Sequence, residues 1–145
     1  MTNTIADITQ DSDVIMLVGA NPEHAHPVIG MQIRQAVQNG TKLIVVDPRD
    51  IDLSKQADIH LKLRPGTNVA FANGMMHIFI EEDLIDHEFI EKRTEGFEAV
   101  KEAVKEYTPE RVAKICNIDA DQLREAARMY AKAKRRKTNL FRTGL

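Results

Sequence analysis

The sequence of 145 residues contains one cysteine, Cys116, and no tryptophan. No disulfide can form within the chain, which is consistent with a reducing compartment. The sequence also lacks an apolar run long enough to cross a bilayer. Its first ten residues lack the basic segment followed by an apolar stretch that marks a secretory signal. We therefore expect a cytoplasmic chain without membrane insertion.

Excess positive charge is also absent. The formal net charge is −2, which argues against nucleic acid as the main partner, because phosphate binding favours a basic surface. With 43% hydrophobic and 29% charged residues, the composition is typical of a folded protein and excludes extensive disorder. The length suits one domain, so we expect a single α/β domain over residues 1–145.

Two nucleotide-binding motifs are missing from the sequence. There is no G-x-G-x-x-G fingerprint and no G-x-x-x-x-G-K-[ST] loop. In both motifs glycines let the backbone approach phosphates closely. Their absence disfavours an ordinary NAD site and an NTPase.

Two continuous apolar runs predict buried parallel strands. Val14–Val18 reads VIMLV and residues 43–46 read LIVV, and both are rich in β-branched residues. Residues 28–38 have apolar positions at helical spacing, and the Asn39-Gly40 pair is a typical helix end. Strand, helix and strand at these spacings indicate a βαβ unit.

The second half of the chain predicts mainly helices. A short helix at 51–57 and an edge strand at 59–63 come first, and the chain ends with a possible strand at 138–141. Between them we expect helices at 69–82, 86–93, 97–106, 109–115 and 120–133. Thr67 or Asn68, Thr108 and Asp119 are the expected N-caps. The expected fold class is α/β, a Rossmann-like three-layer domain with a parallel sheet and a helical C-terminal half.

Three polar loops follow the predicted strands, and ligands of open parallel sheets bind beyond the carboxyl ends of strands. Gly19 allows a ligand close to the backbone, Asn21 offers a donor and an acceptor, and the following helix N-terminus favours phosphate. Asp47 occupies a position that accepts ribose hydroxyls in dinucleotide folds, and Arg49 is suited to phosphate. The third loop contains Gly66, Thr67 and Asn68. Each residue alone could serve only a turn, but three such loops favour a ligand site.

Metal and thiol chemistry are less well supported. His24 and His26 lie close together beside Glu23, but no third ligand at matching spacing is evident. Cys116 is flanked by apolar residues without a paired base, which indicates a buried thiol rather than a nucleophile. We therefore predict no metal ligand among these residues and no catalytic role for Cys116.

The ordered motifs resemble one protein family. The segment DSDVIMLVGANPEHAHPVIGMQIRQAVQNGTKLIVVDPRD, the segment starting RPGTNVAFANGMMHIFIEEDLIDHEF and the segment DQLREAARMYAKAK are similar to molybdopterin oxidoreductases, in particular to formate dehydrogenase large (alpha) subunits. The resemblance implies a bis(molybdopterin guanine dinucleotide) cofactor with molybdenum or tungsten, and one domain of a larger subunit that holds a guanine dinucleotide arm.

The resemblance also assigns roles to the three loops. Residues matching Gly19, Asn21, Pro22 and His26 line one nucleotide arm. Those matching Asp47, Pro48 and Arg49 contact its ribose or guanine end, and those matching Gly66, Thr67 and Asn68 complete the wall. The family's metal-ligating cysteine or selenocysteine, the histidine beside it and the iron–sulfur cysteines have no counterpart here, and Cys116 matches none of them. The tail RRKTNLFRTGL is also more polar than the strand expected there.

The resulting prediction is a cofactor-binding domain, without catalytic residues, of an enzyme that oxidises formate to carbon dioxide. Its partners are the remaining domains of the same subunit and electron-transfer subunits. Two alternatives stay open. One is an autonomous nucleotide-binding module, similar to the α/β domain of thiamine-diphosphate enzymes or to an NAD domain. The other is a docking domain that binds no ligand.

Overall fold

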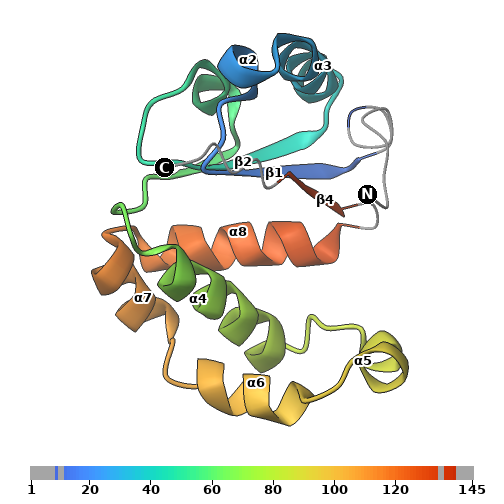
Figure 1. Cartoon of the computed structure of the whole chain (residues 1–145), viewed down its shortest axis with the longest axis vertical. Helices are drawn as coiled ribbons and strands as arrows, with labels where there is room; N and C mark the ends of the chain where they lie inside the picture. Colours follow the sequence, from blue (N-terminus) through green and yellow to red (C-terminus); the bar gives the residue numbers. More distant parts are fainter. Residues whose placement is uncertain (1–8, 10–11, 134–135, 140–145) are drawn as a thin grey trace. The chain divides into compact units, whose positions relative to one another are not determined.

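A computed structural model describes residues 9, 12–133 and 136–139 (Figure 1). Contacts divide the chain into two compact units. Unit 1 comprises Met1–Lys62 with Ala133–Leu145, and unit 2 is Leu63–Lys132. A single domain over the whole chain stays a prediction.

The core of unit 1 is a parallel sheet. Its strands are β1 (Val14–Val18), β2 (Lys42–Val46), β3 (Ile59–Leu61) and β4 (Arg136–Asn139), in the order β3-β2-β1-β4. Every adjacent pair is parallel. This confirms the predicted α/β class and parallel sheet. The possible last strand begins two residues earlier than expected, and positions 140 and 141 lie outside the described residues.

Both faces of the central strands are buried, as the apolar runs predicted. Ile15 and Leu17 of β1 belong to one core cluster with Ile33 of α3 (Pro27–Gln38), and all three are fully buried. The alternate residues Val14 and Met16 are also buried, at 4% and 5% exposure. In Figure 1, α3 lies over one face of the sheet. Burial of this kind stabilises by about 1.5–3 kcal/mol per large aliphatic side chain.

The segment between β1 and α3 differs from the expected loop. Pro22–Ala25 forms a single-turn helix, α2, and α3 begins at Pro27 rather than at position 28. Both helices have proline in their first turn, where its missing N–H is not needed. The loop after β1 therefore leads into this single turn and not directly into the long helix. The end of α3 was predicted correctly, because Asn39 is its C-cap and Gly40 follows with φ +103°.

Two short elements also deviate. The expected helix at 51–57 is a 3-10 helix, η1 (Asp52–Gln56), held by Ser54 Oγ donating to Ile51 O at 2.7 Å. The strand β3 stops at Leu61, two residues earlier than predicted. Element boundaries are commonly displaced by one or two residues, because the terminal pairs are weak.

Unit 2 is helical, as predicted. Its helices are α4 (Asn68–Glu81), α5 (His87–Arg93), α6 (Phe97–Val104), α7 (Pro109–Cys116) and α8 (Ala120–Lys132). Helix α4 contacts α6, α7 and α8. Gly74 of α4 allows the close approach of α7, because a Cβ at this position would lie 2.8 Å from Cγ2 of Val112. No helix in the described part of the chain is long and apolar enough to span a membrane.

Side chains fix the ends of these helices. Asp119 Oδ1 accepts hydrogen bonds from the backbone N–H groups of Asp121 and Gln122, both at 2.9 Å. Thr108 Oγ1 accepts one from Arg111 N at 3.4 Å. Both predicted caps are therefore confirmed, and the Asp119 cap has the better geometry.

Candidate functional site

The loop after β1 starts with a glycine in the left-handed region. Gly19 has φ +60°, and a Cβ added there would meet no atom within 4 Å. Its N–H donates to Val46 O at 2.8 Å, which ties the end of β1 to the end of β2. A strand end with open space beside a glycine backbone gives a ligand room to approach.

Asn21 follows with an unsatisfied acceptor. It occupies the N-cap position of α2, but its side chain makes no capping hydrogen bond. Its Oδ1 atom is buried and has no hydrogen-bond partner among the described residues. Buried polar atoms are nearly always paired in folded proteins, because an unpaired one costs free energy. Oδ1 of Asn21 is thus available to a donor from a bound molecule.

Helix α2 is fastened to α3 at two points. Oε1 of Glu23 accepts from Nε of Arg34 at 3.0 Å and also from Nη2 of Arg34. Beside this pair, Gly30 of α3 lies against the backbone of Glu23, where an added Cβ would be 2.7 Å from Glu23 Cα. The backbone oxygen of Asn21 accepts from His24 N and Ala25 N, so the position of Asn21 follows that of α2.

The loop after β2 contains a buried carboxylate paired with an exposed guanidinium. Asp47 Oδ1 accepts from Arg49 N at 2.9 Å and from Arg49 Nε at 3.0 Å, while Oδ2 accepts from Nη2 at 2.9 Å. The Asp47 side chain is 1% exposed and that of Arg49 is 61% exposed. Burial raises the pKa of the Asp47 carboxyl, but the hydrogen bonds and charge of Arg49 hold that pKa below its ordinary value of 3.8. The pair presents a fixed cation at the strand end.

The end of β3 supports the same loop. Nε2 of His60 contacts Asp47 O at 3.0 Å, and Asp47 N donates to Leu61 O at 3.2 Å. Lys62 Nζ pairs with Asp50 Oδ1 at 2.6 Å. These contacts bring the Asp47–Arg49 segment into a defined position without using the guanidinium of Arg49.

The third predicted loop belongs to unit 2. Gly66 has φ +84° with nothing within 4 Å of an added Cβ. Thr67 is the N-cap of α4 as predicted, but its hydroxyl donates to Arg64 O at 2.6 Å instead of capping the helix. Asn68, the first residue of α4, is exposed. The sulfur of Cys116, which is fully buried as expected, contacts Thr67 O at 3.7 Å.

The structure therefore places two of the three loops on adjacent strands of one sheet. Val18 pairs with Val46, so Gly19 and Asp47 leave β1 and β2 at the same level. Pro22 is buried, whereas His26, Pro48 and Arg49 are exposed. The contribution of Gly66, Thr67 and Asn68 to the same wall stays a prediction.

Sequence reasoning missed two residues beside the site, Arg34 and Gly30, and considered Glu23 only as a neighbour of two histidines. Glu23 and Arg34 are eleven positions apart, and no periodicity links them. Gly30 was the detectable signal, because an isolated glycine inside a helix often marks close packing.

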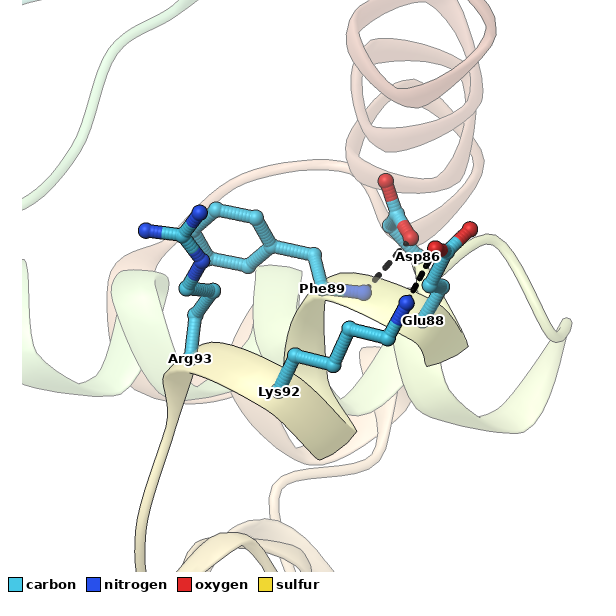
Figure 2. Close-up of a pocket in the computed structure, with 5 residues that line it drawn as sticks. All are labelled: Asp86, Glu88, Phe89, Lys92 and Arg93. Atoms are coloured by element: carbon cyan, nitrogen blue, oxygen red, sulfur yellow. Dashed lines mark hydrogen bonds and ion pairs between the residues drawn. The ribbon is translucent and has the colours of Figure 1, made fainter.

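A separate pocket of about 310 Å³ lies on α5, and Figure 2 shows its lining. It is formed by Asp86, Glu88, Phe89, Lys92 and Arg93. Its charges are partly neutralised within the helix, since Lys92 pairs with Glu88 at 2.7 Å and Asp86 caps Phe89 N at 2.9 Å. None of the predicted site residues lines this pocket.

In the described part of the chain, no group of three or more His, Cys, Asp or Glu residues could hold a metal ion. The candidate site at the ends of β1 and β2 consists of the open backbone of Gly19, the amide oxygen of Asn21 and the fixed guanidinium of Arg49. Such a set suits a polar ligand with hydroxyl or amide donors and an anionic group.

Residues 1–136 match the family model of molybdopterin oxidoreductases. The chain belongs to this family, whose name specifies a molybdopterin cofactor. The F420-dependent formate dehydrogenase subunit alpha of Methanocaldococcus jannaschii is 47% identical over 93% of this chain and 20% of its own length. Formate dehydrogenase H of Escherichia coli is 44% identical over 92% of this chain and 19% of its own length.

A solved structure supports the same assignment. Acetylene hydratase from Pelobacter acetylenicus superimposes with a TM-score of 0.83 and is 36% identical, over 92% of this chain and 18% of that one. The chain thus spans about a fifth of the length of the curated relatives it matches. The resemblance to molybdopterin oxidoreductases, and to formate dehydrogenases among them, is confirmed.

Proposed function

We propose that this chain holds a guanine dinucleotide arm of a molybdopterin cofactor, at the ends of β1 and β2, within an enzyme that oxidises formate. The observation that supports this proposal best is the buried Oδ1 of Asn21, which has no hydrogen-bond partner among the described residues. Asn21 lies two residues beyond the open backbone of Gly19. A guanine or ribose donor satisfies that atom and removes the free-energy cost of leaving it unpaired.

The described residues fit such a group in three respects. Gly19 leaves room at the end of β1. Asn21 offers an acceptor. Arg49 presents a guanidinium whose orientation is fixed by Asp47 and which suits a phosphate or pyrophosphate. The anionic and hydroxyl-rich chemistry of a guanine dinucleotide matches these groups.

In this proposal Asp47 acts mainly by holding Arg49. Its carboxylate already accepts three hydrogen bonds from Arg49, of which only one is to Oδ2. Oδ2 keeps acceptor capacity for a ribose hydroxyl, but the side chain is 1% exposed, so the hydroxyl reaches it only if the loop opens. Gly66, Thr67 and Asn68 complete the wall in the same proposal, as do Pro22, His26 and Pro48.

The bound molybdenum or tungsten centre supplies the redox chemistry, and this chain's residues bind and orient the cofactor that carries it. We further propose that the catalytic residues and any iron–sulfur cluster belong to other parts of the enzyme. Its remaining domains and electron-transfer subunits are the proposed partners, and the cytoplasm is the proposed location. The formate dehydrogenase relatives support formate as the substrate.

The test is a titration of the purified chain with GDP, with ADP and NAD as controls. A ligand that binds only the folded state raises the melting temperature. We expect stabilisation by GDP alone, with NMR shifts at Gly19, Asn21 and Arg49. Preference for ADP or NAD would instead support an autonomous nucleotide module, and no response to any of the three would support a docking domain.

A further inference from the structure

The position of Asn21 depends on a helix of one turn. Helix α2 spans four residues, and its backbone bonds to Asn21 O come from His24 and Ala25 at 3.2 and 3.1 Å. So short a helix is not stable alone, because nucleation costs more free energy than one turn returns. The contacts between α2 and α3 therefore decide where Asn21 lies.

Glu23 is the side chain through which α2 is held. Its side chain is 17% exposed, and its Oε1 accepts hydrogen bonds from Nε and Nη2 of Arg34, whereas Oε2 is buried without a hydrogen-bond partner among the described residues. A carboxylate in this state is costly to bury without its cation. Without Arg34, the Glu23 carboxylate has a lower free energy when turned toward water than when buried against α3.

Gly30 makes this arrangement possible. An added Cβ would lie 2.7 Å from Cα and 2.8 Å from N of Glu23, and both are backbone atoms that cannot rotate away. The glycine thus brings α2 close enough to α3 for Glu23 to reach Arg34 one turn further along the helix.

We propose that Glu23 and Arg34 are positioning residues for the nucleotide-binding loop at the end of β1. They hold α2 on α3 and thereby fix Asn21 for its ligand. The identity of the ligand in this inference rests on the proposed function. The geometry is that of the chain without ligand. Both residues act through α2 and are assigned no contact with the nucleotide.

The first test uses the full 145-residue chain without ligand. Arg34→Met removes the cation, and amide hydrogen exchange is measured at His24, Ala25 and His26. We expect exchange at these amides to accelerate at least tenfold, and Arg34→Lys to restore most of the protection. Lys42→Met is the matched control, because Lys42 also pairs with a partly buried carboxylate, Asp58, at 2.7 Å. This control should leave the three amides within twofold of the wild type.

The second test measures the dissociation constant for GDP. Arg34→Met should weaken binding about tenfold, and Lys42→Met should change it less than twofold. Glu23→Gln separates positioning from simple charge. It makes the chain less negative, so a purely electrostatic role predicts tighter binding of the anionic probe. Positioning predicts weaker binding, because the amide holds Arg34 less strongly.

The outcomes are distinguishable. Unchanged exchange in Arg34→Met would overturn the inference, as would tighter GDP binding by Glu23→Gln. A third outcome also overturns the inference: Arg34→Met lowers the melting temperature but weakens GDP binding no more than Lys42→Met does. The pair would then be a structural contact only. If the wild-type chain does not bind GDP, the proposed function fails, and the exchange measurement alone decides whether the pair fixes the loop.

Discussion

The side chains of Asp47 and Arg49, two residues apart, form a bidentate ion pair. Nε of Arg49 lies 3.0 Å from Oδ1 of Asp47, and Nη2 lies 2.9 Å from Oδ2. The carboxylate is 1% exposed and the guanidinium side chain 61% exposed. A buried carboxylate thus holds an exposed guanidinium in a fixed orientation at the end of β2.

This pair predicts a pH dependence for the stability of unit 1. The pKa of Asp47 is lower in the folded chain than in the unfolded one. Its stabilising contribution is therefore complete above the ordinary pKa of 3.8 and is lost as the pH falls through the lower folded pKa. Asp47→Asn should be less stable than the wild type at pH 7, and the difference should shrink below pH 4.

The measurement is the free energy of opening from amide exchange in β1 and β2, over a series of pH values. Tyrosine fluorescence reports on unit 2 in the same samples, because both tyrosines, Tyr107 and Tyr130, belong to it. It is the internal control, since Asp47 lies in unit 1. An equal difference between variant and wild type at pH 7 and pH 3 would contradict the prediction.

Gly19→Ala tests the ligand site by adding one methyl group. The methyl meets no atom of the free chain within 4 Å, so the cost without ligand is the strain of φ +60°, about 1 kcal/mol. With a nucleotide at the strand end the methyl occupies its space, and GDP binding should weaken tenfold or more. Gly96→Ala is the matched control, since Gly96 has φ +71° and equally open surroundings. Similar affinities for the two variants would argue against a ligand at Gly19.

Gly74→Ala tests the packing of α4 against α7 in unit 2. The new Cβ would lie 2.8 Å from Cγ2 and 3.0 Å from Cγ1 of Val112, so the Val112 side chain or the helices must shift. Overpacking of this kind costs about 1–3 kcal/mol. Val112→Ala alone leaves a cavity, but the double variant fits the new methyl into the vacated space. Urea denaturation followed by tyrosine fluorescence should show the double variant less destabilised than the sum of the single ones. If the losses of stability of the two single variants simply added in the double variant, the contact between position 74 and Val112 would not be the cause of the destabilisation.

The N-caps of α7 and α8 predict an order of effects. Asp119 accepts two backbone hydrogen bonds at 2.9 Å, whereas Thr108 accepts one at 3.4 Å. Asp119→Ala should therefore cost about 1–2 kcal/mol and Thr108→Ala less, near 0.5 kcal/mol. Both are measured by the same urea denaturation of unit 2. The reverse order would show that a factor other than cap geometry dominates.

Local signals explain why most of the fold could be predicted. The continuous apolar runs at β1 and β2, the Asn39-Gly40 helix end and the Asp119 cap each depend on neighbouring residues, and the structure contains all of them. Helix α2 escaped prediction because Pro22 and Pro27 interrupt the apolar pattern, although proline is tolerated in a first turn.

The candidate site was predictable in its location but not in its internal contacts. The strand-end rule located Gly19 and Asp47, which the structure places at the same level of the sheet. It gave no indication that the carboxylate of Asp47 is already bound by Arg49, or that Glu23 reaches Arg34. Such contacts depend on side-chain rotamers and on the close approach at Gly30, which no one-dimensional pattern contains.

The pairing of β4 with β1 has a consequence for the order of folding during synthesis. Unit 2 is one continuous segment, so all of its helices have left the ribosome once Lys132 has emerged. The sheet of unit 1 is completed later, because Arg136 pairs with Val14 and closes the longest loop among the described strand pairings. Until then one edge of β1 is exposed as an unpaired template. Any pause in synthesis that keeps Arg136 inside the ribosomal exit tunnel should therefore favour aggregation through β1, whereas a pause after Asn139 has emerged should not.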